Sequence, residues 1–263
     1  MKYIKYLIYK IFGLKTYLQI VSRTYIRLIS MGLGKAQYPE IHYLKQIVKP
    51  GSHCIDIGAN LGYYSYFMSK YAGASGKVYS IEPIPLFGEI WKKNVARTGF
   101  NNIELLPYAL GAEEKKVTMG MPVIDGTVHH GMTKIIDSNS QCEKTFEVQM
   151  QVPDTLFQNL PKIDFLKIDI EGYEHVAFAN MKNLLKRDKP LIQSELGGEE
   201  NRKECFAILT ELGYKPYILQ ENELTEIPVS EINDHGQDFY WKHILTMCLM
   251  LPFFIKILDG TCF

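Results

Sequence analysis

Short hydrophobic runs along the chain alternate with longer stretches in which hydrophobic residues recur at helical spacing. The short runs predict strands and the periodic stretches predict helices. The strand-like runs are residues 53–57, 77–82, 102–110, 163–170, 190–196, 214–220 and 238–243, and the helical stretches are 63–71, 86–98, 173–186 and 201–212. Strands that alternate with helices in this way form β-α-β units, so the pattern predicts an α/β fold with a mostly parallel sheet.

Residues 115–151 interrupt this alternation. Two extended segments, VTMGM and FEVQMQ, flank a loop rich in Gly, His and Ser. Because binding pockets in α/β folds are often shaped by such loops and insertions, we expect this segment to help define what the protein binds.

Residues 1–48 predict a basic amphipathic helical extension. Ile4, Leu7, Ile8 and Ile11 recur at helical spacing, and residues 1–39 hold seven basic residues and no acidic one. Lysines interrupt every apolar run before it reaches the length of a signal-peptide core. Two interpretations stay open: the helix packs on the surface of its own domain, or residues 1–30 rest on an anionic membrane.

Residues 244–263 predict an apolar C-terminal helix. Its apolar run, residues 244–258, contains Pro252 and Lys256, and it is shorter than the ~20 residues that a membrane-spanning helix needs. We expect it to pack against the domain or a second subunit, which leaves a homo-oligomer open, or to contact a membrane interface. Residues 49–243 between the two extensions are expected to form one domain.

The amino-acid composition argues against several classes of protein. The 263 residues include 29 Lys and Arg against 29 Asp and Glu, and a nucleic-acid-binding protein would carry a basic surface instead. The five Cys are scattered without a C-x-x-C pair, so a disulfide framework or a Cys-ligated zinc site is not expected. A reducing compartment, the cytoplasm, fits this cysteine usage best.

Four acidic residues occur where predicted strands end, namely Asp56, Glu82, Asp169 and Glu195. In a parallel sheet the carboxyl ends of the strands meet at one edge, where ligands bind. The first acid opens the segment DIGANLG, in which Gly58 and Gly62 flank Asn60. Glycines allow a tight turn and a close approach of the backbone to a ligand.

The acid in front of these glycines indicates the kind of ligand. No G-x-G-x-x-G follows the first strand, and a carboxylate at Asp56 suits an ammonium or sulfonium group better than a pyrophosphate. Glu82, at the end of the second strand, can accept both hydroxyls of a ribose. S-adenosylmethionine combines these groups, so we expect it as the cofactor.

Three segments resemble the FkbM family of S-adenosylmethionine-dependent O-methyltransferases: DIGANLGYYS (56–65), IEP (81–83) and IDFLKIDIEGYE (163–174). The resemblance implies a Rossmann-like class I methyltransferase fold, with a seven-stranded sheet whose last strand is antiparallel and helices on both faces. The cofactor-binding positions expected from residues and resemblance together are Asp56, Gly58, Asn60, Gly62, Glu82, Pro83, Ala109 and Asp169. Where family members often carry a T-L-D triplet, this chain has VPDTL (152–156), so no role is carried over to Asp154.

The catalytic candidates must lie near the reacting methyl group and be able to take a proton. We expect Asp169, Glu171 and His130 to be catalytic, with Glu195 and His129 as further candidates. Each has a structural alternative: Asp169 can bind the cofactor's amino group, and Glu171 can stabilise a helix dipole. Lys167 shares a strand face with Asp169 and can pair with it. Asp169, Glu171 and Glu195 are hard oxygen ligands, but nothing in their spacing requires a metal, and we predict none.

The leading functional hypothesis is transfer of a methyl group to a hydroxyl, on a sugar of a glycan or a lipid-linked saccharide. A nicotinamide-dependent oxidoreductase on a related sheet is the alternative enzyme. A non-catalytic module that binds a membrane or a partner is the alternative from another class. We expect no nucleic-acid partner.

Overall fold

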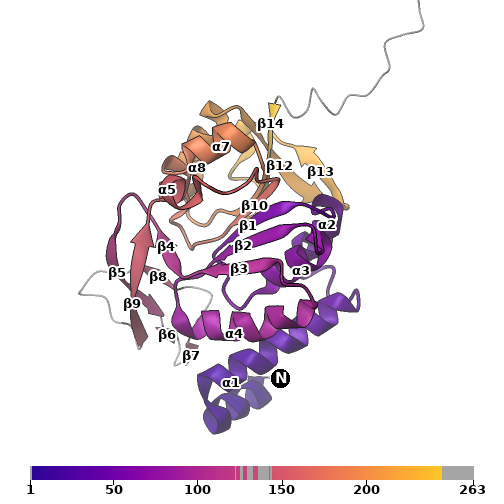
Figure 1. Cartoon of the computed structure of the whole chain (residues 1–263), viewed down its shortest axis with the longest axis vertical. Helices are drawn as coiled ribbons and strands as arrows, with labels where there is room; N and C mark the ends of the chain where they lie inside the picture. Colours follow the sequence, from indigo (N-terminus) through magenta and orange to yellow (C-terminus); the bar gives the residue numbers. More distant parts are fainter. Residues whose placement is uncertain are drawn as a thin grey trace, which may run out of the picture.

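The computed structural model describes residues 2–121, 123–124, 127–128, 133–135, 142 and 144–244. Its centre is an eight-stranded sheet of order β13-β12-β14-β11-β10-β1-β2-β3 (Figure 1). The strands are β1 (His53–Ile57), β2 (Lys77–Ile81), β3 (Ile103–Leu106), β10 (Phe165–Ile168), β11 (Leu191–Glu195), β12 (Tyr214–Gln220), β13 (Glu223–Glu226) and β14 (Asp238–His243). The neighbours from β3 to β11 pair in parallel and β14 is antiparallel to β11, which confirms the predicted α/β fold.

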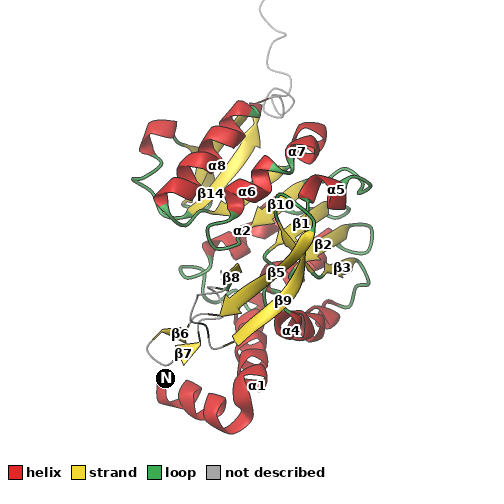
Figure 2. Cartoon of the chain, turned by 90° about the vertical axis from the view of Figure 1, so that its left-hand side faces the viewer, coloured by secondary structure: helices red, strands yellow, loops and turns green. Residues whose placement is uncertain are grey.

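Helices cover both faces of the sheet (Figures 1 and 2). Neighbouring residues of a strand point to opposite faces, so Cys54 packs with α2 (Pro39–Ile47) and α3 (Tyr63–Ala72), whereas Ile55 packs with the other helix layer. That layer contains α6 (Glu174–Ala179), α7 (Lys182–Asp188) and α8 (Glu199–Glu211). Helix α4 (Pro85–Val95) continues into a short 3₁₀ turn, Ala96–Thr98, and ends at Gly99 with φ 82°, as the sequence predicts.

The expectation of seven strands is wrong by one, because β13 adds an eighth at the sheet edge. It pairs with β12 across a two-residue turn, Glu221 and Asn222, whose φ angles are 48° and 70°. Positive φ at both central residues is typical of the tight turn that joins hairpin strands. The β13 sequence ELTE is too short and acidic to stand out as a strand.

The predicted helix over 173–186 is two helices, α6 and α7. The side-chain amide of Asn180 donates to the Val176 carbonyl oxygen at 2.8 Å as α6 ends. The Asp154 carboxylate, on the short helix α5 (Pro153–Phe157), then accepts the backbone N–H groups of Asn183 and Leu184 at 3.0 Å each. Asp154 therefore stabilises the start of α7.

The predicted strand over 102–110 is also divided. After β3, the segment β4 (Tyr108–Leu110) joins a second sheet of order β4-β9-β5-β8. Strands β5 (Lys115–Met121) and β9 (Lys144–Gln151) confirm the two predicted extended segments. The remaining strands are β6 (Val123–Ile124), β7 (Thr127–Val128) and β8 (Lys134–Ile135), and a second 3₁₀ turn spans Val229–Glu231.

The N-terminal extension forms α1 (Lys2–Ser30), which lies along α4 (Figure 1). Its helical geometry is broken at Gly13, with φ 75° and ψ 169°. Beyond the break, Leu14, Leu18, Ile26 and Ile29 are buried against the domain, in favour of the packing interpretation for this face. No helix among the described residues is long and apolar enough to span a bilayer. The helix predicted over 244–263 lies outside the described residues beyond Ile244.

Candidate active site

The loop after β1 turns sharply at two glycines. Gly58 has φ 77°, and a Cβ there would lie 1.8 Å from the carbonyl oxygen of Asp169. Gly62 has φ 88°, and a Cβ there would lie 2.9 Å from Cδ1 of Trp91. Glycine at 58 therefore lets the ends of β1 and β10 approach each other, and glycine at 62 lets α3 begin close to α4.

Glu82 organises the same loop from the end of β2. Its two carboxylate oxygens accept the backbone N–H groups of Asn60 and Ile84, each at 2.8 Å. Burial raises the pKa of Glu82 to about 7, although these two hydrogen bonds act in the opposite direction. A carboxylate has about four acceptor positions, so the group keeps capacity for ligand hydroxyls.

Asp56 is fully buried beneath the loop. Its Oδ2 accepts the hydroxyl of Ser65, which also contacts Ser80 and Trp91. Burial raises the pKa of Asp56, although Lys167 and Ser65 counteract the rise. The other oxygen, Oδ1, and the side-chain oxygen of Asn60 have no hydrogen-bond partner among the described residues. Two buried acceptors without donors are what a ligand with an ammonium or hydroxyl group would satisfy.

Asp169 follows β10 directly and pairs with Lys167. The Lys167 Nζ lies 3.1 Å from Asp169 Oδ2 and 4.9 Å from the ring centre of Tyr64. Burial lowers the pKa of Lys167, but the charges of Asp169 and Asp56 outweigh burial and raise it above the usual value. Lys167 therefore stays charged and holds Asp169 in place, as its position in the sequence suggested.

Three further acids surround this pair, and each has a pKa raised to about 7. For Glu171, partial desolvation and the charges of Asp169 and Glu195 raise the pKa. For Glu195, the causes are desolvation followed by Asp169 and Asp238. For Asp238, which faces Glu195 across the β11 and β14 pair, they are desolvation followed by Glu40 and Asp169. Carboxyl groups with such values can exchange protons near neutral pH.

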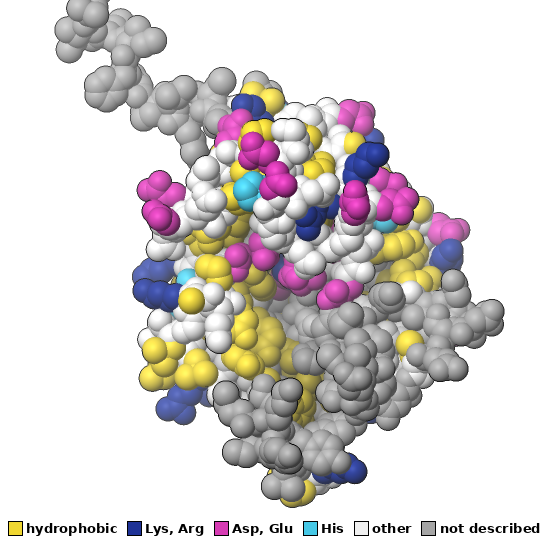
Figure 3. Space-filling view, turned by 180° about the vertical axis from the view of Figure 1, so that it is seen from behind, with side chains coloured by type: hydrophobic (Ala, Val, Ile, Leu, Met, Phe, Trp, Pro, Cys, Tyr) yellow, Lys and Arg dark blue, Asp and Glu magenta, His cyan; other side chains and the backbone are white. Residues whose placement is uncertain are grey.

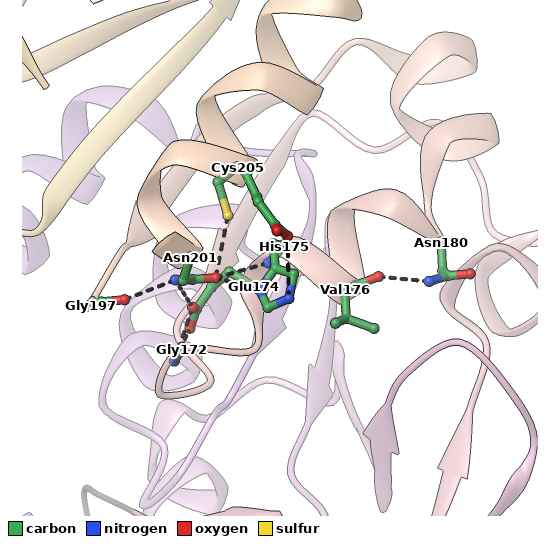
Figure 4. Close-up of polar contacts among 9 residues, drawn as sticks. Gly172, Glu174, His175, Val176, Asn180, Gly197, Asn201 and Cys205 are labelled. Carbon is green, nitrogen blue, oxygen red and sulfur yellow. Dashed lines mark hydrogen bonds and ion pairs between the residues drawn. The ribbon is translucent and has the colours of Figure 1, made fainter. Parts of the chain in front are cut away.

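Glu174, a residue that the sequence analysis did not single out, supports the loop that carries Asp169 and Glu171. Its carboxylate accepts the backbone N–H group of Ile170 at 2.7 Å. It also accepts the backbone N–H group of Gly172 at 3.1 Å and the side-chain amide of Asn201 at 2.7 Å (Figure 4). Asn201 in turn bonds His175 and the Gly197 carbonyl oxygen. An acid in the first turn of the helix after a strand-end loop was the available signal.

Most of the predicted cofactor residues lie together along three cavities. The Glu82 cavity, about 70 Å³, is lined by Gly58, Asn60, Glu82, Pro83, Asp169 and Glu171, among others. The Ala109 cavity, about 470 Å³, shares Gly58, Pro83 and Glu171 with it and adds Ala109 and Tyr108. The tyrosine cavity, about 510 Å³, is lined by five tyrosines, by Asp56 and by several acids, and it shares Gly58, Asn60 and Asp169 with the Glu82 cavity. Figure 3 shows acidic side chains gathered across the middle of the face opposite to that of Figure 1, above a hollowed hydrophobic area.

The remaining predicted positions stand apart. Gly62 lines none of these cavities but shapes the turn into α3. His129 and His130 lie outside the described residues, so the catalytic role of His130 stays a prediction. Among the described residues, no three His, Cys, Asp or Glu side chains are grouped to hold a metal ion. The prediction that no metal takes part stays a prediction as well.

The residues present fit S-adenosylmethionine. Glu82 offers acceptors for ribose hydroxyls, and the unpartnered oxygens of Asp56 and Asn60 match an amino group. Carboxylates outnumber cations around Asp169, and this excess of negative charge favours a ligand with a positive sulfur.

Comparisons with known proteins identify the family of this chain. The Methyltransferase FkbM domain matches residues 56–216. Among curated proteins, the chain is 36% identical over 58 residues to a protein-L-isoaspartate O-methyltransferase of Methanocella arvoryzae and 39% identical over 56 residues to one of Methanococcus maripaludis. These matches cover 22% and 21% of this chain and only 31% and 26% of the relatives' lengths.

Two solved structures are also similar. The methyltransferase FkbM of Methylobacillus flagellatus KT gives a TM-score of 0.48 at 13% identity, over 86% of this chain and 59% of the other. Fibrillarin of Aeropyrum pernix, solved with S-adenosyl-L-methionine, gives a TM-score of 0.43 at 14% identity, over 74% of this chain and 68% of the other. The domain match covers more than half of the chain and confirms the family predicted from its motifs. The chain therefore belongs to the FkbM family of S-adenosylmethionine-dependent methyltransferases.

Proposed function

We propose that this protein transfers the methyl group of S-adenosylmethionine to a hydroxyl oxygen of a sugar, in a glycan or a lipid-linked saccharide. The observation that carries the proposal is the position of Asp169. This carboxylate lines both the Glu82 cavity and the tyrosine cavity, so a group bound in either cavity can reach it. The family membership disfavours the nicotinamide-dependent alternative.

The cofactor would be held on the Glu82 side. Glu82 would bind the ribose, with Pro83 and Ala109 lining the cavities beside it. The amino-acid end of the cofactor would reach the edge of the tyrosine cavity, where Asp56 and Asn60 offer unpaired oxygens for the amino group. S-adenosylmethionine, when bound, supplies an activated methyl group on a positively charged sulfur. The protein's own task is then to hold the acceptor oxygen in line and to take its proton.

Asp169 is the base that this arrangement favours. Glu171 lines only the Glu82 and Ala109 cavities, whereas Asp169 and Glu195 line the tyrosine cavity, where we place the acceptor. The ion pair with Lys167 fixes Asp169 beside the shared wall of the two cavities. Glu195, with its pKa of about 7, can receive the proton next and pass it to solvent because its side chain is exposed.

Methyl transfer from radiolabelled S-adenosylmethionine into glycan and lipid-linked saccharide extracts tests this proposal. We expect label in a saccharide fraction, and we expect mass spectrometry to place the added methyl group on oxygen. Asp169→Asn is the matched control, since it should bind the cofactor product S-adenosylhomocysteine in calorimetry without transferring label. Cofactor binding with no transfer to any saccharide would favour the non-catalytic module instead.

The outer face of α1 and the residues directly after it support a location at an anionic membrane. Six of the nine exposed large hydrophobic side chains among the described residues lie within residues 11–33: Ile11, Phe12, Ile20, Leu28, Met31 and Leu33. Basic residues are interspersed with them, and no acid occurs before Glu40. Apolar side chains within a basic helix are typical of peripheral attachment to anionic lipid.

We therefore place the protein in the cytoplasm, on the inner surface of a membrane; the free cysteines Cys54 and Cys205 suit a reducing compartment. Ile20→Asp should abolish co-sedimentation with phosphatidylserine vesicles, whereas Phe100→Ser, which changes an exposed side chain elsewhere, should not. Equal binding of both variants, or equal binding to neutral phosphatidylcholine vesicles, would contradict membrane attachment through α1.

A further inference from the structure

One part of the wall of the tyrosine cavity is aromatic, and the other part is acidic. Tyr17, Tyr25, Tyr38, Tyr63 and Tyr64 line it as half-buried aromatic rings. The Tyr25 ring is at the centre of this group, with its centroid 5.7 Å from that of Tyr38 and 6.3 Å from that of Tyr63, both edge to face. Packing between the rings holds them in fixed orientations, so the cavity offers a rigid apolar surface.

The remaining wall is acidic. Glu40, Glu195 and Asp238 line it together with Asp169, and Lys167 is the only cation among its described lining residues. That lysine is paired with Asp169 at 3.1 Å. The raised pKa values of Glu195 and Asp238 reflect this crowding, after desolvation. An anionic group here would meet repulsion from the carboxylates, and the cation that lines the described part of the cavity is already paired.

The aromatic wall comes largely from the N-terminal extension. Tyr17 and Tyr25 lie on α1 and Tyr38 lies just before α2, and all three precede the family-matched residues 56–216. The cofactor loop and Glu82 lie within the matched segment. The part of this cavity built by the extension therefore lies outside the matched domain.

We propose that the tyrosine cavity is the acceptor site, that Tyr25 and Tyr38 bind the face of an uncharged sugar ring, and that the acidic wall excludes uronic acids and sugar phosphates. The inference rests on the proposed methyl transfer and adds the acceptor class to it. Aromatic rings bury the C–H face of a sugar, while the carboxylates of Glu40 and Asp238 accept its hydroxyls. Because Asp169 borders the same cavity, a hydroxyl of the bound ring can reach the proposed base.

The test uses the full chain saturated with S-adenosylhomocysteine and simple glycosides as probes. Saturation-transfer NMR should detect at least one of the methyl pyranosides of glucose, galactose, mannose and rhamnose, and should not detect methyl glucuronide at pH 8. Tyr25→Ala and Tyr38→Ala should each weaken the binding about three- to tenfold, as loss of an aromatic contact does. Tyr71→Ala, which removes a half-buried tyrosine outside the cavity, is the matched control and should leave the binding unchanged.

The charge of the wall is tested separately with the double variant Glu195→Gln, Asp238→Asn, which should begin to bind methyl glucuronide. Failure of all four neutral glycosides to bind, or equal binding of glucuronide by the native chain, would overturn this inference. Loss of binding that is as large in Tyr71→Ala as in Tyr25→Ala would overturn it too. Calorimetry with S-adenosylhomocysteine alone distinguishes the proposed methyl transfer from the proposed acceptor class. If S-adenosylhomocysteine does not bind, the proposed function is refuted, and not merely the acceptor class.

Discussion

Glu174→Gln isolates the contribution of the buried carboxylate that supports the Asp169 loop. The native group accepts three hydrogen bonds, from Ile170 N, Gly172 N and Asn201 Nδ2. A glutamine keeps one acceptor oxygen but presents an amide donor where Oε2 now accepts from two donors. Asn201 cannot simply rotate, because its side-chain oxygen already accepts from the backbone N–H of His175 at 3.1 Å.

In the variant, the hydrogen bond from Ile170 N therefore loses its charged acceptor. The donors Gly172 N and Asn201 Nδ2 then face another donor, the amide group of the new glutamine. At about 1–3 kcal/mol for each of the two buried donors left without an acceptor, we expect a loss of about 2–6 kcal/mol in the free energy of unfolding. Displacing the loop by about 1 Å should also lower kcat about 100-fold, since catalysis depends on the placement of Asp169.

Urea unfolding and steady-state methyl transfer measure the two effects. Glu204→Gln is the matched control: this side chain is half exposed and lies 3.5 Å from the His175 ring, so its loss should change stability by less than about 0.5 kcal/mol. If Glu174→Gln unfolds at the same urea concentration as Glu204→Gln, the carboxylate does not support the loop and the reasoning is wrong.

Three further predictions concern the cofactor and the acids around it. Asp169→Asn should reduce kcat by about 100- to 10,000-fold while S-adenosylhomocysteine affinity, read by calorimetry, changes far less; equal losses would make Asp169 a binding group only. At pH 8, where the Glu82 carboxyl with its pKa of about 7 is ionised, Glu82→Gln should weaken S-adenosylhomocysteine binding by about 1.5–3 kcal/mol, because hydrogen bonds to a charged acceptor are lost. Unchanged affinity would remove Glu82 from the cofactor site. In the folded state, desolvation raises the pKa of four carboxyl groups to about 7, from usual pKa values of 3.8 to 4.5; the four are Glu82, Glu171, Glu195 and Asp238. Between these pH values the folded state therefore binds more protons than the unfolded state. The melting temperature of the ligand-free protein should therefore fall as pH rises from about 5 to 7.5, and a rise over that range would show that these groups ionise normally.

The sequence predicted the parts of the site that depend on local chemistry. Asp56 lies near the end of β1, Gly58, Gly62, Glu82 and Asp169 come after strand ends, and the parallel sheet brings these ends to one edge. Most of these side chains consequently lie along shared cavities. The pairing of Lys167 with Asp169 was likewise accessible from strand alternation.

Features that depend on distant contacts were not predicted. Glu174 became a loop support through Asn201, which is 27 positions away along the chain. The break between α6 and α7 depends on Asp154, which lies 29 positions before Asn183. Strand β13 exists because a positive-φ turn at Glu221 and Asn222 folds an acidic segment back on β12, and the hydrophobic periodicity of the sequence does not mark that strand.

The two faces of α1 connect the proposed membrane location with the proposed acceptor class. Its inner face packs on the domain and contributes Tyr17 and Tyr25 to the tyrosine cavity, while Ile20 and Leu28 are exposed. A helix that lies on lipid with one face and lines the cavity with the other would place the cavity within reach of a sugar whose lipid stays in the membrane. For such an acceptor, vesicle binding and methyl transfer should decline together in Ile20→Asp, whereas transfer to a water-soluble methyl glycoside should not change. That contrast would separate a lipid-linked saccharide from a free glycan as the substrate.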